Sequence, residues 1–282
     1  MRDFLRRALF AVIAIPLAGG IIWVGGTALA VLLAVLAGLA AWEFFRLSAR
    51  GGVHAFDRAG VPLAAAIPLV VHANHLQVSR VPVGAGALVL LALFAAAVWR
   101  RVGERPLSAV GATIFGVLYT GGMITYAYGL RYHPYVIDAP AGTALIGLAL
   151  IVTWSTDTGA YVFGKAFGRR KLLPAVSPGK TWAGAIGGLA LAVPAVGVYV
   201  QYVLEPVARL SLTAVGIAVF AVLTSATAQV GDLAESLLKR EAGVKDSSRL
   251  IPGHGGVLDR FDSLLFVLPV SYMLLSEFLV PA

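Results

Sequence analysis

Cysteine is absent from this chain of 282 residues, and acidic side chains are few, with 14 Asp and Glu against 22 Lys and Arg. Without a thiol, the protein has neither disulfides nor a thiolate nucleophile nor a Cys-ligated zinc site. Charged residues of both signs make up only 13% of the sequence, about half the share found in soluble globular domains. The composition therefore excludes an ordinary soluble domain.

Apolar residues make up 59% of the chain, and the mean hydropathy is +0.86. A helix needs about 20 apolar residues to cross the hydrocarbon core of a bilayer. A transmembrane β-barrel would alternate apolar and polar residues instead. We therefore predict an all-α, polytopic helical bundle that forms a single integral membrane domain. Nine spans are expected, at residues 8–24, 27–45, 60–75, 82–99, 108–130, 142–163, 182–203, 211–231 and 263–280.

Basic residues are distributed unevenly between the two sides that these spans define. With the amino terminus inside, 19 of the 22 Lys and Arg lie on the cytoplasmic side, and only Arg80, Arg131 and Arg209 lie opposite. The positive-inside rule then predicts a cytoplasmic amino terminus and an external carboxyl terminus. It also accounts for the net charge of +8 without a nucleic acid partner. Residues 1–20 resemble a signal peptide, but no clear A-x-A site follows, so we expect them to remain as the first span.

A charge-dense segment, SLLKREAGVKDSSRLIPGHGGVLDRFDS, separates the last two apolar runs at residues 236–263. Its Lys and Arg side chains suit polyphosphate, and its acids suit a divalent cation. Asp259 and Asp262 share one helix face if a helix already begins there, although two acids at a helix start can also be simple caps. With a single local histidine, His254, and no cysteine, oxygen ligands favour Mg²⁺ over zinc.

Three acids lie within or directly after apolar runs, and each has its own interpretation. Asp232 precedes Glu235, Ser236 and Lys239 on one predicted helix face, and its side chain is expected to point into the bundle. Asp157 lies at the cytoplasmic end of another apolar span, 142–163, and an ionised acid in hydrocarbon is costly, so we expect it to face a polar cavity or a cation. Glu43, between Trp42 and Phe44, is interpreted as an ordinary glutamate at the membrane interface.

The loop after Asp157, FGRRKLLPAVSPGKTWAG, is basic and rich in hydroxyl groups, with Ser177 and Lys180 as candidate phosphate ligands. Its GKT at residues 179–181 is not a Walker A motif, because Pro174 stands where that pattern requires glycine. The alternative is that its charge only sets orientation in the membrane.

These motifs together resemble the signature of the phosphatidate cytidylyltransferases. The match runs in order and spacing through Ser236, Lys239, Arg240, Lys245, Asp246, Pro252, His254, Gly255, Gly256, Asp259, Arg260 and Asp262. It extends upstream through Asp157 to Tyr161, Ser177, Pro178, Lys180 and Thr181. One departure is Ala183, where the family commonly has an acid. If that acid binds metal or orients the loop, this protein must manage otherwise.

The resemblance implies Mg²⁺-dependent transfer of a cytidylyl group from CTP to phosphatidic acid, giving CDP-diacylglycerol and pyrophosphate. We expect Asp232 and Asp259 to be the metal ligands, with Asp246, Asp262 and His254 as further catalytic groups. Substrate binding is assigned to Asp157, Ser177, Lys180, Ser236, Lys239, Arg240, Lys245 and Arg260. The expected location is a bacterial inner membrane with the active site facing the cytoplasm, and a homodimer is one option.

Two other functions are alternatives to this one. A cation-coupled secondary transporter would explain acids within spans, but it has no need for clustered KR, KD, HGG and DRxD motifs on one side. An alcohol phosphotransferase acting on CDP-linked lipids would show a DG…AR…G…D…D pattern, which the sequence lacks.

Overall fold

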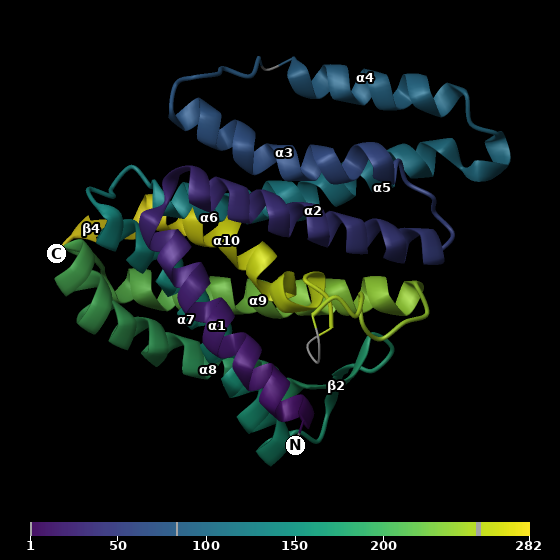
Figure 1. Cartoon of the computed structure of the whole chain (residues 1–282). Coiled ribbons are helices and arrows are strands. Elements are labelled where there is room, and N and C mark those ends of the chain that lie inside the picture. Colours follow the sequence, from purple (N-terminus) through teal and green to yellow (C-terminus); the bar gives the residue numbers. More distant parts are fainter. Residues whose placement is uncertain (1, 83, 252–254) are drawn as a thin grey trace. The chain divides into compact units, whose positions relative to one another are not determined.

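A computed structural model describes residues 2–82, 84–251 and 255–282 (Figure 1). The chain divides into two compact units. Unit 1 consists of Met1–Ile21, Gly25–Tyr128 and Leu238–Arg260, and unit 2 consists of Ile22–Val24, Gly129–Leu237 and Phe261–Ala282.

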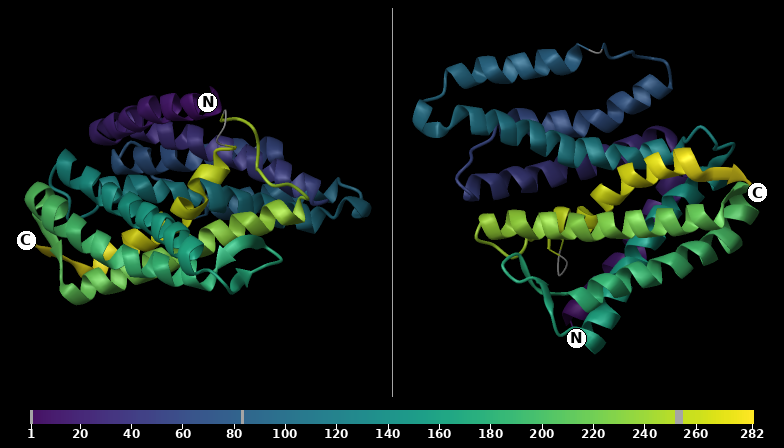
Figure 2. Two further views of the ribbon diagram at one scale, coloured as in Figure 1. Left: turned by 90° about the horizontal axis from the view of Figure 1, so that it is seen from below. Right: turned by 180° about the vertical axis from the view of Figure 1, so that it is seen from behind.

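Unit 1 is helical. It contains most of α1 (Arg2–Val24), then α2 (Gly26–Arg50), α3 (Asp57–His75), α4 (Ala85–Val98), the short η1 (Val102–Glu104), α5 (Pro106–Val117), the π-helical turn η2 (Leu118–Gly122) and the first part of α6 (Met123–Arg131). Two views show α2, α3, α4 and α5 lying alongside one another (Figures 1 and 2).

Unit 2 contains α7 (Ala139–Phe167), β1 (Lys171–Leu173), β2 (Ser177–Thr181), α8 (Trp182–Tyr199), the π-helical η3 (Val200–Ala208), β3 (Leu210–Leu212) and most of α9 (Ala214–Glu241). It ends with most of α10 (Leu258–Phe278) and with β4 (Leu279–Pro281). The last turn of α9 and the first residues of α10 belong to unit 1.

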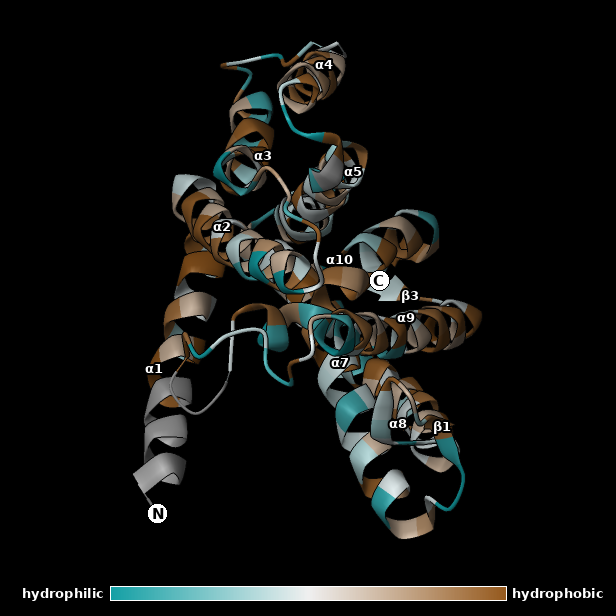
Figure 3. Cartoon of the chain, turned by 90° about the vertical axis from the view of Figure 1, so that its right-hand side faces the viewer, coloured by the Kyte–Doolittle hydropathy of each residue, from teal (hydrophilic) through white to brown (hydrophobic). Residues whose placement is uncertain are grey.

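Within the described part of the chain, six helical segments are long and apolar enough to cross a membrane. They are Gly26–Arg50, Pro106–Arg131, Ala139–Phe167, Trp182–Ala208, Ala214–Glu241 and Leu258–Phe278. Colouring by hydropathy shows apolar residues along most of these helices (Figure 3). The predicted helical membrane protein is confirmed. The remaining predicted spans coincide with α1, α3 and α4, so the count of nine stays a prediction.

Two short antiparallel ladders were not predicted. Strand β1 pairs with β2 in the basic loop after α7, and β3 pairs with β4 through Leu210 opposite Pro281 and Leu212 opposite Leu279. The apolar Leu172 and Leu173 and the turn at Pro174 favour a hairpin within what the sequence presented as an irregular loop.

The core of unit 1 is aromatic where α2 meets α3 and α5. Phe44 and Phe45 are buried, and their ring centroids lie 5.5 Å apart in an edge-to-face arrangement. Phe115 and Tyr119 stack on each other and both contact Phe44. The Phe44 ring, only 4% exposed, therefore packs inside the unit.

In unit 2, α7 packs closely against α8, and a hydrogen bond joins α7 to α9. A side chain at Gly159 would collide with the backbone of Gly187, so this small residue permits the close approach of the two helices. The Thr156 hydroxyl donates to the Ser225 hydroxyl over 2.8 Å, and the Gln229 amide donates to the Ala185 carbonyl over 3.1 Å. These contacts fix α7, α8 and α9 around a cavity.

Candidate active site

A cavity of about 490 Å³ opens in unit 2 among α7, the β1–β2 hairpin, α8 and α9. Its size lies within the range of roughly 300 to 1,000 Å³ that is usual for small-molecule sites. Its polar lining includes Asp157 from α7, Lys180 from β2, and Gln229 and Asp232 from α9. The prediction that Asp157 faces a polar cavity is therefore confirmed.

An ion pair joins two sides of this cavity. The Lys180 ammonium lies 2.7 Å from a carboxylate oxygen of Asp232, and both side chains retain access to solvent. The hairpin places Lys180 at the cavity. The next residue, Thr181, caps α8 by accepting a hydrogen bond from the Gly184 N–H over 3.1 Å, which fixes the end of β2 to this helix. One turn further along α9, the Ser236 hydroxyl approaches the other oxygen of Asp232 at 3.5 Å.

The same cavity offers a donor set that fits Mg²⁺. Within the described part of the chain, no three His, Asp or Glu side chains cluster closely enough to form a metal site. Mg²⁺ usually keeps several waters and takes only one or two carboxylates together with substrate phosphates. Asp157 and Asp232 supply two carboxylates to one open cavity, which also contains the Lys180 ammonium. These residues therefore fit Mg²⁺ together with substrate phosphates.

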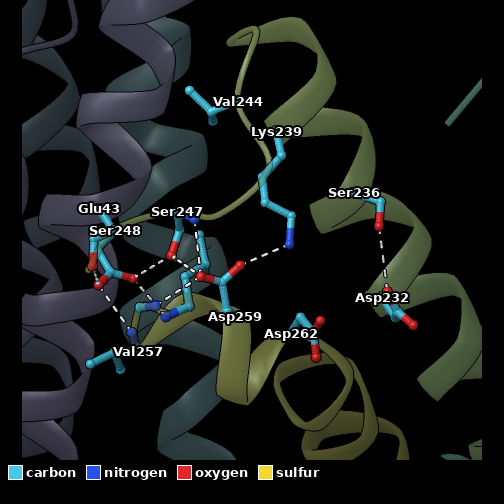
Figure 4. A network of polar contacts seen from close by, with 12 residues as sticks. Glu43, Asp232, Ser236, Lys239, Val244, Ser247, Ser248, Val257, Asp259 and Asp262 are labelled. Atoms are coloured by element: carbon cyan, nitrogen blue, oxygen red, sulfur yellow. Dashed lines mark hydrogen bonds and ion pairs between the residues drawn. The ribbon is translucent and has the colours of Figure 1, made fainter. Parts of the chain in front are cut away.

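In unit 1, the carboxylate of Asp259 organises the loop between α9 and α10 (Figure 4). One oxygen accepts from the Lys239 ammonium at 2.8 Å. The other accepts from the Ser247 N–H at 3.0 Å, the Ser247 hydroxyl at 2.9 Å and the Gly256 N–H at 2.8 Å. Asp259 thus links three parts of the charge-dense segment.

Glu43 holds this loop from the other side and was misinterpreted from the sequence. Its carboxylate is fully buried and accepts from Ser247 and Ser248 hydroxyls at 2.9 and 2.6 Å and from the N–H groups of Val257 and Leu258 at 3.0 and 2.7 Å. It is not an ordinary interfacial glutamate. No signal next to Glu43 in the sequence identifies this role, because its partners lie more than 200 positions further along the chain.

Two glycines make this arrangement possible. Gly255 has φ of +81°, a conformation that favours glycine, and its N-terminal neighbours up to Pro252 lie outside the described residues. A Cβ on Gly256 would collide with the Ser247 hydroxyl and with both carboxylate oxygens of Glu43.

Replacing Gly256 by alanine is therefore expected to lower turnover about tenfold or more, because even small displacements of a catalytic loop are costly. Gly111→Ala is the matched control, since a Cβ there meets nothing within 4 Å. Both variants are to be purified and assayed side by side for the activity proposed below. Equal turnover in the two would show that the close contact at Gly256 is unimportant.

A family model described as the cytidylyltransferase family matches residues 5–278. The chain belongs to the cytidylyltransferase family. It is similar to a phosphatidate cytidylyltransferase of Pseudomonas aeruginosa, 36% identical over 289 residues that cover 96% of both chains. Proteins of the same name from Haemophilus influenzae and Bacillus subtilis are 48% and 41% identical over 141 and 169 residues. These two alignments cover 50% and 60% of this chain and 48% and 59% of the relatives.

The other predicted site residues of this cytidylyltransferase family member differ in their exposure and in the unit to which they belong. Helix α10 begins at Leu258, so Asp259 and Asp262 both lie on a helix, as the shared-face hypothesis requires. Arg240, Lys245, Asp246 and Arg260 are exposed, while Ser177 is half-buried in β2. His254 lies outside the described residues. Asp232 and Asp259 belong to different units, so their joint role at one metal stays a prediction.

Proposed function

We propose that this chain is a phosphatidate cytidylyltransferase, which transfers CMP from CTP to phosphatidic acid and releases CDP-diacylglycerol and pyrophosphate. The observation that carries the proposal is the unit 2 cavity, in which Lys180 pairs with Asp232 beside Asp157. Such a cavity, set among apolar helices, suits a reaction between a water-soluble polyphosphate and a lipid phosphate. The name shared by the relatives from three bacteria supports the same activity.

The reaction requires the protein mainly to neutralise the charge of the two substrates and to align them. A phosphate monoester is already a nucleophile at neutral pH, so neither a strong base nor a covalent intermediate is needed. Lys180 would neutralise phosphate oxygens, while Asp157 and Asp232 would hold Mg²⁺ in the same cavity. When bound, Mg²⁺ would supply positive charge that stabilises the transferring phosphoryl group. The phosphate monoester of the lipid attacks the α-phosphorus of CTP, and pyrophosphate leaves.

An apolar groove in unit 1 supports a lipid substrate. It measures about 670 Å³ and runs between α2 and α3, with Gly38, Trp42, Ala65 and Leu69 among its lining residues. Leu250, from the loop that Glu43 and Asp259 hold, also lines it. A groove of this kind would accommodate an acyl chain of phosphatidic acid.

We further propose nine spans with the amino terminus in the cytoplasm, Ala282 on the far side and the active site facing the cytoplasm of a bacterial inner membrane. The support is the asymmetry of 19 to 3 in basic residues. A reporter that works only in the cytoplasm should be inactive when fused after Ala282. An active reporter at both termini would exclude an odd number of spans.

The activity itself is tested with purified protein, CTP, phosphatidic acid and Mg²⁺, with the lipid product identified by mass spectrometry. The expected product is CDP-diacylglycerol, formed in equal amount to pyrophosphate. If no nucleotide-linked lipid forms, and the reconstituted protein instead moves a solute across liposomes, the transporter hypothesis would replace this one.

A further inference from the structure

Glu43 is a fully buried acid of unit 1 that the proposed chemistry does not use. Each of its carboxylate oxygens accepts one serine hydroxyl and one backbone N–H. One oxygen takes Ser248 Oγ and the Val257 N–H, and the other takes Ser247 Oγ and the Leu258 N–H. Because hydrogen bonds to a charged acceptor are the strong ones, four such donors offset the penalty of burying this acid.

The helix that carries Glu43 provides a rigid base. The next two residues, Phe44 and Phe45, are buried in the aromatic core of unit 1. There is no room for them to shift, since a Cβ on Gly60 of α3 or Gly116 of α5 would already collide with these rings. The carboxylate is therefore fixed by α2, and the loop must adapt to it.

Two of the four donors belong to the start of α10. The first N–H groups of a helix have no partner within the helix and carry partial positive charge, so an anion there is stabilising. The usual cap is a side chain next to the helix start. Here the cap for Val257 and Leu258 comes from a residue 214 and 215 positions earlier in the chain. Glu43 thus fixes the end of the loop and the beginning of α10 together.

Of the other two donors, Ser248 binds Glu43 alone of the two acids, whereas Ser247 connects Glu43 to Asp259. The Ser247 hydroxyl lies 2.9 Å from an oxygen of Glu43 and 2.9 Å from an oxygen of Asp259, which in turn pairs with Lys239 (Figure 4). A shift of Ser247 would move two of the three donors on that Asp259 oxygen. The position of the Asp259–Lys239 pair therefore depends on Glu43.

We propose that Glu43 is a positioning residue. It holds the described part of the loop between α9 and α10, residues 242–251 and 255–257, in the shape that places Asp259 and Lys239 for catalysis, and it acts through Ser247 without touching substrate. The kinetic part of this proposal rests on the proposed cytidylyl transfer. The structural part, that Glu43 immobilises the loop, stands independently of it.

The kinetic test is Glu43→Gln. Glutamine keeps the shape of the side chain but replaces one oxygen by an NH₂ group, which must then face the Val257 or the Leu258 N–H. Substitutions that disturb the partners of catalytic groups typically lower activity about 10- to 100-fold, and we expect a fall in kcat of this size. Glu43→Asp, which keeps both oxygens, should recover part of the loss in kcat.

Thr113→Val is the matched control, because Thr113 is equally buried in unit 1 and accepts the Phe56 N–H over 2.8 Å to join two elements away from this loop. Loss of this hydrogen bond shows how a purely structural change in unit 1 affects kcat. We expect kcat per folded molecule to stay near the unsubstituted value in this variant. A fall in kcat equal to that of Glu43→Gln would overturn the proposal.

The structural test uses the absence of cysteine. A single Leu250→Cys substitution, at a residue 44% exposed, gives a unique site for a spin label in the loop. Glu43→Gln should increase the mobility of this label in the electron paramagnetic resonance spectrum, and Thr113→Val should not. An immobile label in Glu43→Gln overturns the proposal whatever the activity. If the unsubstituted protein makes no CDP-diacylglycerol, the proposed function fails, but the label still decides the role of Glu43.

If Glu43→Gln does not fold, the same bonds are tested from the loop side. Ser247 contacts both Glu43 and Asp259, whereas Ser248 contacts Glu43 and the Leu250 N–H. Ser247→Ala should release the label and lower kcat more than Ser248→Ala. The reverse order would contradict a path from Glu43 through Ser247 to Asp259.

Discussion

Replacing Asp232 by asparagine is expected to lower kcat by a factor of about 100 or more, because the cavity then loses one of two carboxylates available to a hard cation. The substitution also leaves the Lys180 ammonium without its partner at 2.7 Å. Asparagine keeps the shape of the side chain, so the protein should still insert and fold. The measurement is the initial rate of CDP-diacylglycerol formation at saturating CTP and phosphatidic acid, over a range of Mg²⁺ concentrations.

Asp138→Asn is the matched control for this experiment. Asp138 is also an acid of unit 2, but it caps the other end of α7 by accepting the Ala141 N–H over 2.8 Å. Its replacement removes charge at a helix start, which costs about 1 kcal/mol of stability or less, and should leave kcat nearly unchanged. Normal kcat in Asp232→Asn would remove Asp232 from the metal site.

Asp259→Asn is expected to have an effect of similar size, at least about 100-fold in kcat, because it removes a charge pair that is little exposed and disturbs the loop that this carboxylate organises. An asparagine side chain has a single acceptor oxygen. It therefore cannot accept both from the Lys239 ammonium, 2.8 Å away, and from the N–H groups of Ser247 and Gly256. Turnover is to be measured together with the Mg²⁺ concentration that gives half of the maximal rate.

The Mg²⁺ titration separates two roles of Asp259. A metal ligand, as predicted from the sequence, should raise the half-saturating Mg²⁺ concentration when it is neutralised. A residue that only organises the loop should lower kcat at an unchanged Mg²⁺ requirement. Near-normal turnover with unchanged Mg²⁺ dependence would show that both roles are wrong, and Asp246 and Asp262 would then be the pair to test.

The sequence predicted those features that depend on local patterns. Long apolar runs predicted the helices, and the cost of an acid in hydrocarbon predicted that Asp157 faces a polar cavity. Spacing on a helix placed Asp232 and Ser236 on one face, where they now approach each other. Each of these inferences uses residues within a few turns of one another.

The features that were missed depend on contacts between distant parts of the chain. Glu43 bonds with residues more than 200 positions away, and nothing next to it in the sequence specifies Ser247 or Leu258. The ion pair of Lys180 with Asp232 similarly requires a short hairpin that the basic composition of the loop obscured. Pattern analysis finds which residues are chemically suitable, whereas packing decides which of them meet.

The most direct test of the proposed activity is to follow two labels of CTP through one reaction. The purified protein is incubated with phosphatidic acid, Mg²⁺ and CTP labelled either at the α- or at the γ-phosphorus. Transfer of CMP predicts that the α-label enters the lipid and that the γ-label appears only in pyrophosphate. Label from the γ-position in the lipid, or no labelled lipid from either, would contradict cytidylyl transfer by this protein.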